Sequence, residues 1–233
     1  ARWPEWRLGT ALVAASFAAL LVLFLADRPM LWGLEMRVTP VGAVLLAALA
    51  TTWIAGPVIT VGLVLLRKIP GASKLTESLE TRGMGTDLTV GAVVGIMAGL
   101  LATPFLAGAA AGVVRTSAVA ITIAAVSQAL VTEVLLRLFL TTAVAWLLLQ
   151  WHRVTRNEAV ALAIIVAAGV QVALYLPGTL AIGFPTLLAA AGYIGTAVLL
   201  PALAFGTLYW TRGFRSALVA HTAALMVVAL MAF

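Results

Sequence analysis

The sequence contains no cysteine among its 233 residues. Disulfide bridges, thiolate catalysis and metal sites with cysteine ligands are therefore excluded. Charged residues are also scarce, at 9% of the chain against about 25% in soluble domains. Hydrophobic residues make up 64% of it. Because such a chain cannot cover its surface with polar groups, its solvent must be lipid.

Backbone hydrogen bonding then limits the fold, since only helices and closed barrels satisfy their own polar groups in lipid. Barrel strands would appear as alternating segments of about 10 residues. The sequence shows long continuous apolar runs instead. These runs predict an all-α fold, a polytopic transmembrane helix bundle that forms a single membrane domain over residues 1–233.

Seven apolar runs reach the roughly 18 residues needed to cross a bilayer. They cover approximately 8–26, 41–66, 88–112, 120–150, 157–176, 187–209 and 214–233. The first is too long for the core of a signal peptide, so we expect it to be retained. Pro57 and Pro104 predict kinks in the second and third runs. The fourth exceeds one straight crossing, so it either tilts or begins as a surface helix around 117–128.

The basic residues are distributed unequally between the two sides that seven spans define. Ten of the fourteen Lys and Arg residues share the side of the N-terminus, three lie on the other side, and Arg137 lies inside a span. The ten are Arg2, Arg7, Arg67, Lys68, Lys74, Arg82, Arg153, Arg156, Arg212 and Arg215, and the three are Arg28, Arg37 and Arg115. The positive-inside rule then predicts a cytoplasmic N-terminus, in a bacterial inner membrane. No basic run with interleaved aromatic residues indicates a nucleic-acid partner.

The longest loop covers residues 67–87. Within it, Leu75 and Leu79 are four residues apart between Ser73 and Arg82, a spacing typical of a short interfacial helix. No loop is long enough to form the core of a second, soluble domain. Outside the spans we therefore expect only this interfacial segment to have structure of its own.

Glycines recur every four residues in the third run. Gly91, Gly95 and Gly99 form a doubled G-x-x-x-G pattern, and Gly108 and Gly112 form another. Such glycines lie on one helix face and allow a neighbouring backbone to approach closely. The face serves either packing inside the bundle or contact with another subunit, and internal packing is the simpler interpretation.

Away from their ends, the predicted spans contain three ionisable residues: Glu133, Arg137 and His221. A charge near the bilayer centre costs at least about 2.5–3.5 kcal/mol, so these residues should face the bundle interior. Glu133 and Arg137 are four apart and can pair on one helix face. The pair is either a structural ion pair or part of a site, and His221 is either a hydrogen-bonded structural residue or a ligand. Glu133 and His221 alone are too few for a usual zinc site.

Three segments resemble a known family. The segment 132–137, TEVLLR, resembles the E-E-x-x-x-R motif of the CPBP family, the CAAX-protease and bacteriocin-processing (Abi) membrane proteins. The segment 172–177, VALYLP, is similar to its F-x-x-x-H region, and 205–225, FGTLYWTRGFRSALVAHTAAL, to its last motif, which carries H-x-x-x-N. The resemblance covers about 117–228. It implies an intramembrane protease in which the first Glu activates a water, while two His and an Asn position groups and stabilise the oxyanion.

The residue-by-residue comparison changes that expectation. Glu133, Arg137 and His221 match the second Glu, the Arg and the last His of the family motifs. The remaining motif positions differ: Thr132 replaces the first Glu, Gln171 the Phe, Tyr175 the middle His and Leu225 the Asn. A threonine cannot act as a carboxylate base, so the resemblance implies a vestigial site.

Three functional hypotheses follow. The first is a degenerate, non-proteolytic CPBP relative that serves as an interaction or accessory subunit and binds a membrane-protein partner in the bilayer. It is motivated by the lost base, the glycine-lined helices and the short loops. The second is an active CPBP/CAAX-type endopeptidase. The third is a pigment- or cofactor-associated subunit of an energy-transducing complex, with His221 or His152 as ligand; because no haem-attachment motif is present, we expect no cofactor.

Overall fold

The computed structural model describes residues 5–25, 39–70, 84–106, 118–151, 153–181, 184 and 186–231. Over these residues every regular element is a helix, which confirms the all-α prediction. The elements are α1 Glu5–Leu25, α2 Pro40–Ala50, the π-helix η1 Thr51–Ala55, α3 Gly56–Lys68, α5 Met84–Leu106, α6 Ala118–Glu133, the π-helix η3 Val134–Thr141, α7 Thr142–Leu149, α8 Arg156–Ala181, α9 Leu187–Tyr193, the π-helix η4 Ile194–Leu199, α10 Leu200–Arg212 and α11 Phe214–Met231.

Seven of the described helical stretches are long and apolar enough to cross a membrane, as predicted. They are Leu8–Leu25, Pro40–Lys68, Gly85–Pro104, Ile121–Leu149, Arg156–Pro177, Leu187–Arg212 and Phe214–Met231. This is the pattern of an integral membrane protein in a lipid bilayer. The expected interfacial helix at 73–82, the second glycine pair at 108 and 112, and the residues 28, 37, 115 and 152 lie outside the described residues.

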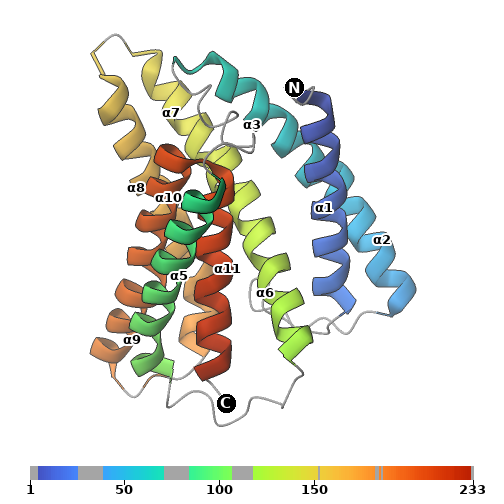
Figure 1. The fold of residues 1–233 in the computed structure, drawn as a ribbon, viewed down its shortest axis with the longest axis vertical. Coiled ribbons are helices and arrows are strands. Elements are labelled where there is room, and N and C mark those ends of the chain that lie inside the picture. The colour runs from blue at the N-terminus through green and yellow to red at the C-terminus, as the bar shows by residue number, and fades with distance from the viewer. Residues whose placement is uncertain are drawn as a thin grey trace.

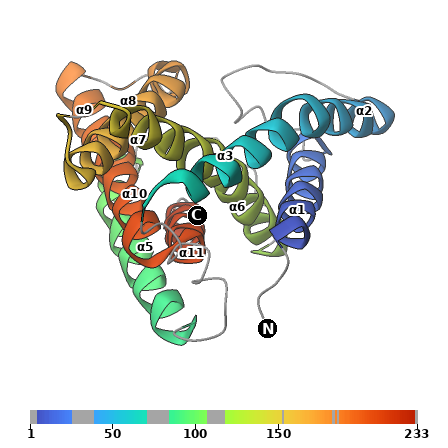
Figure 2. The same ribbon diagram turned by 90° about the horizontal axis from the view of Figure 1, so that it is seen from above.

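The chain runs up and down between two ends. The N-terminus and the C-terminus lie at opposite ends of the molecule, as an odd number of crossings requires (Figure 1). Helices α5, α8, α9, α10 and α11 form one group, and α1 and α2 stand apart from it on the other side (Figure 1). Helix α3 crosses over toward α7, and it packs on both η3 and α7 (Figure 2).

The fourth span connects the two groups. It is one continuous helical stretch over α6, η3 and α7, and it runs obliquely across the molecule (Figure 1). Its 29 residues from Ile121 to Leu149 extend about 43 Å at 1.5 Å per residue, more than the roughly 30 Å of a hydrocarbon core. A continuous oblique helix of this length fits the tilted alternative. Half of this span is buried (50%), against 22–33% for the others, so it is the central helix.

Three spans change from α- to π-helical hydrogen bonding in mid-course. In the second span, η1 ends directly before Gly56 and Pro57, and in the sixth, η4 is followed by Leu200 and Pro201. A proline has no N–H to donate to the preceding turn, so a locally wider turn accommodates it. Next to Pro57, where the sequence predicts a kink, the structure has a π segment. Pro104 lies inside α5, which continues through it to Leu106.

The glycine face of α5 packs against α11. A Cβ atom at Gly91 would lie 2.5 Å from the carbonyl oxygen of Ser216, and one at Gly99 would lie 2.6 Å from Cβ of Val227. One at Gly95 would meet the carbonyl oxygen of Ala220. These distances leave no room for any side chain larger than hydrogen. The face is used within the chain, and it sets the position of α11 along α5.

Candidate functional site

Glu133 is the last residue of α6 and the centre of a buried polar cluster. Its side chain has no exposed surface (0%). One carboxylate oxygen, Oε1, lies 2.9 Å from Nδ1 of His221 on α11. The other, Oε2, lies 3.6 Å from Nε of Arg137 in η3. The carboxylate thus joins His221, which is 88 positions away along the chain, to Arg137, which is four residues away on the same helical stretch.

Arg137 extends the cluster to two further helices. Its Nη2 donates a hydrogen bond of 2.8 Å to Oε1 of Gln171 on α8 and one of 3.1 Å to the carbonyl oxygen of Ala202 on α10. Like Glu133, the arginine is fully buried (0%). The cluster therefore connects the fourth, fifth, sixth and seventh spans.

The ion pair inside this cluster is electrostatic rather than hydrogen-bonded. A separation of 3.6 Å is too long for a hydrogen bond between Arg137 Nε and Glu133 Oε2. Neither atom, nor Nη1 of Arg137, has a hydrogen-bond partner among the described residues. Because a buried charge without compensation is costly, each residue depends on the other to remain in the bundle.

The π-helix η3 begins directly after Glu133 and contains Arg137. Two threonines at its C-terminal end bond to carbonyls five residues earlier: Thr141 Oγ1 to Leu136 O at 2.8 Å and Thr142 Oγ1 to Arg137 O at 3.3 Å. These bonds stabilise the wider turn. Thr142 Oγ1 also lies 3.0 Å from the hydroxyl of the buried Tyr209 on α10. Such π segments occur frequently at functional sites.

A second polar cluster lies next to the first. Gln128 Nε2 on α6 donates a 3.1 Å hydrogen bond to the hydroxyl of Tyr175 on α8. The side chain of Thr132, on the same helix as Gln128, lies near this hydroxyl. Thr132 and Tyr175 are the positions that correspond to the catalytic Glu and the middle His in the family resemblance. The two positions thus face each other across α6 and α8. They bring together the hydroxyl of a threonine and that of a tyrosine, where the family motif has a carboxylate and an imidazole.

On α11 the surroundings of His221 are largely apolar. Its ring packs against the ring of Phe205 with centroids 5.2 Å apart and planes inclined by 30°. Leu225, one turn further along α11, is half-buried and offers no polar group where the family motif has an amide. His221 therefore has a carboxylate on one side and an aromatic ring on another.

Gln171 has a role that sequence reasoning missed. The sequence marked it only as a departure from a motif, yet it is buried and accepts the hydrogen bond from Arg137. Gln171 and Tyr175 are four residues apart in the largely apolar middle of α8, and this spacing is a local signal for a polar face. Tyr209 was missed as well, and no spacing along the chain relates it to Thr142.

The arrangement limits what chemistry is possible. Both oxygens of Glu133 face a cationic or hydrogen-bonding partner, and the side chain is closed to solvent. No group of three or more His, Asp or Glu residues in the described part of the chain is placed to hold a metal ion. The geometry suits a structural junction between helices better than an open hydrolytic centre.

The structure brings Glu133, Arg137 and His221 into one cluster and Thr132 and Tyr175 into another. Gln171 joins the first cluster, Leu225 belongs to neither, and the glycines of α5 pack inside the bundle. Comparisons with models of known protein families, with curated proteins and with solved structures found no match for this chain.

Proposed function

We propose that this chain is a CPBP-like membrane protein without proteolytic activity that serves as an interaction or accessory subunit of a membrane complex. The observation that carries the proposal is the state of Glu133, which is fully buried and held between His221 and Arg137. At the position of the family's base stands Thr132, which lies near the hydroxyl of Tyr175. The polar junction is kept, and its one carboxylate is already engaged by two partners.

For hydrolysis, it is not enough that a carboxylate lies on the helix that carries the motif; it must also be able to contact the attacking water. A general base must lie within about 2.6–3.2 Å of the water it activates. Glu133 already has His221 at that distance on one oxygen and Arg137 near the other. The oxyanion of a peptide intermediate also needs aligned donors, and Leu225 supplies none.

Contact with a partner is supported by an aromatic residue in an unusual place. Trp53 is 76% exposed, although it lies in η1 near the middle of the second span. Tryptophans of membrane proteins usually lie at the two interfaces, where amphipathic rings meet the headgroups. Tryptophan is enriched among the residues that carry most of the binding energy at protein interfaces. The α5 glycine face gives no such support, because it packs against α11.

The orientation that we propose places the N-terminus in the cytoplasm of a bacterial cell, with the chain in the inner membrane. Six described basic residues belong to the span ends and connections that lie at the end of the molecule where α1 begins (Figure 1). They are Arg67, Lys68, Arg153, Arg156, Arg212 and Arg215. This asymmetry supports retention of that end in the cytoplasm.

A cleavage assay tests the loss of activity. The purified protein is reconstituted in liposomes and offered prenylated CAAX peptides and leader peptides. We expect no cleavage by the wild type, and none by Thr132→Val. Specific cleavage by the wild type that disappears in Glu133→Gln, with helicity retained, contradicts the proposal. It would establish the second candidate, an active endopeptidase.

Native purification tests the subunit role. After chemical cross-linking in the native membrane and extraction in mild detergent, we expect a defined membrane-protein partner whose yield falls in Trp53→Ala. Trp151→Ala is the matched control, since Trp151 is also exposed (68%) but follows the end of α7. A monomer without any partner contradicts the proposal. A visible absorption band in the purified protein would instead establish the pigment-associated alternative.

A further inference from the structure

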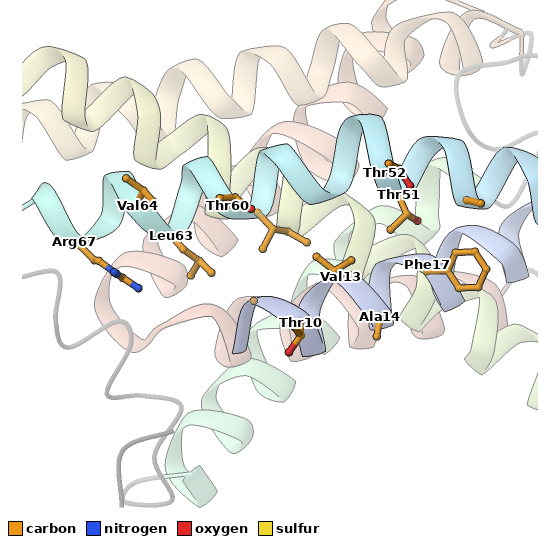
Figure 3. Close-up of a pocket in the computed structure, with 13 residues that line it drawn as sticks. Thr10, Val13, Ala14, Phe17, Thr51, Thr52, Thr60, Leu63, Val64 and Arg67 are labelled. Atoms are coloured by element: carbon orange, nitrogen blue, oxygen red, sulfur yellow. The ribbon is translucent and has the colours of Figure 1, made fainter. Parts of the chain in front are cut away.

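A cleft of about 690 Å³ opens between the first two spans, away from the buried cluster. Helix α1 forms one wall and the stretch from α2 through η1 to α3 forms the other (Figure 3). The lining is mainly aliphatic, with threonines and one arginine. It comprises Gly9, Thr10, Val13, Ala14, Phe17, Ala48, Thr51, Thr52, Ile59, Thr60, Leu63, Val64 and Arg67.

The cleft has a charged end and an apolar end. Arg67, an exposed residue in the last turn of α3, lies at one end, and Phe17 lies toward the other (Figure 3). Arg7 stands in the first turn of α1, two residues before Gly9. The wall from Arg67 to Ala48 extends about 28 Å along the helix at 1.5 Å per residue. The cleft therefore leads from the membrane surface deep into the hydrocarbon layer.

We infer that this cleft binds an anionic phospholipid, with one acyl chain between α1 and α3 and the phosphate beside Arg67. Charge complementarity selects the headgroup, because a guanidinium at the membrane surface attracts anionic lipids and pairs with phosphate. The apolar lining of the cleft accommodates the acyl chain of the lipid. The site is separate from the Glu133 cluster, so it does not depend on the function proposed above.

The size of the cleft favours a lipid over a protein helix. Its volume lies within the roughly 300–1,000 Å³ of ordinary small-molecule sites. A transmembrane helix of 20 residues is about 10 Å across and 30 Å long, which is several times that volume. A second copy of the chain would therefore cover the mouth of the cleft and leave its depth unfilled.

Native mass spectrometry of the full chain in mild detergent tests the inference. The protein is titrated with phosphatidylglycerol and with phosphatidylcholine that carry identical acyl chains. We expect a one-to-one complex with phosphatidylglycerol that is about five-fold tighter than that with phosphatidylcholine. Arg67→Gln should abolish this preference, while Arg153→Gln, an exposed arginine at the same end of the molecule, should retain it.

Gly9→Leu tests the acyl-chain site. A Cβ atom at Gly9 meets only Cδ1 of Leu63, at 3.7 Å, so a leucine enters the cleft without a backbone clash. Leucine also favours the helix more than glycine does, so the variant should fold. We expect binding of both lipids to fall at least ten-fold. Gly169→Leu is the control, because a Cβ atom there meets nothing within 4 Å and the position lies on α8, outside the cleft.

Three results would overturn the inference. In the first, Gly9→Leu binds both lipids as the wild type does. In the second, Arg67→Gln keeps the preference for phosphatidylglycerol. In the third, the wild type forms a dimer whose cross-links run through Thr10 and Thr60, which would make the cleft an interface between copies of the chain.

Discussion

The carboxylate of Glu133 shows how a single ionised residue is kept inside a membrane bundle. His221 and Arg137 contact it from two directions, and Arg137 is in turn held by Gln171. Each of these contacts offsets part of the desolvation that burial imposes on the charge. Removing one partner leaves the others buried and uncompensated.

Glu133→Gln should therefore destabilise the folded protein by about 3–5 kcal/mol, because it leaves Arg137 as an unpaired buried cation. Denaturant titration of the detergent-solubilised protein, followed by circular dichroism, measures the change. Glu158→Gln is the control: that residue is exposed and accepts hydrogen bonds from the Thr155 backbone N–H and hydroxyl at the start of α8. A glutamine can accept the same bonds, so a loss below about 1 kcal/mol is expected there. Equal losses in both variants would contradict the importance of the ion pair.

Two buried threonines should respond in opposite ways to the same substitution. Thr51 is buried and its hydroxyl has no hydrogen-bond partner among the residues described, whereas the Thr142 hydroxyl lies 3.0 Å from that of Tyr209. Thr51→Val removes an unsatisfied polar group and should stabilise the protein by about 1 kcal/mol. Thr142→Val leaves the buried Tyr209 hydroxyl without this partner. It should lower the free energy of unfolding by about 1–3 kcal/mol. Unfolding midpoints of the two variants, compared in one detergent, test the difference in sign.

At the scale of elements, the pairing of α5 with α11 positions the cluster. Gly95 faces Ala220, and Ala220 is the residue before His221. A displacement of α11 at this level therefore moves the imidazole away from Glu133. The sequence predicted a close helix approach from the glycine spacing, but nothing in the third run indicated which helix approaches. The partner depends on contacts between residues more than 120 positions apart.

Gly95→Ala tests this coupling. Alanine favours an isolated helix by about 1 kcal/mol over glycine, yet here its methyl group meets the Ala220 carbonyl and must push the helices apart. We expect a net destabilisation of about 1–3 kcal/mol. Gly169→Ala, with open space around it, should stabilise by about 0.5–1 kcal/mol. Thermal unfolding in detergent distinguishes the two variants. A higher unfolding temperature for Gly95→Ala than for the wild type would contradict a close contact between α5 and α11 at this position.

The π segments are a second feature of this scale. The proline at position 57 predicted an irregularity in the second span, and η1 is found there. No proline marks η3, although it carries Arg137. The hydroxyls of Thr141 and Thr142 bond to carbonyls five residues back along the same helix, and one of them also contacts Tyr209 on another helix. Local propensity does not encode such an arrangement.

At the scale of the whole molecule, seven spans place the loops alternately on two sides of the membrane. Because the native chain has no cysteine, single cysteines can be introduced without background labelling. Leu187→Cys, in a position 87% exposed at the start of α9, should react with a membrane-impermeant maleimide in intact cells. Arg153→Cys should react only after the membrane is opened. The reverse result would contradict the proposed orientation, and labelling of both from one side would contradict the odd number of crossings between them.

By itself, the sequence determined that this protein is a membrane helix bundle, where its seven spans lie, and which ionisable residues fall inside them. These properties depend on composition and on spacings of a few residues. They follow directly from the cost of placing unpaired backbone groups and charges in hydrocarbon. Only the tertiary structure decided that His221 meets Glu133, that Gln171 and Ala202 hold Arg137, and that the glycine face serves α11. Those contacts depend on which helix faces which and in what register. Side-chain packing between spans decides that, and no local pattern records it.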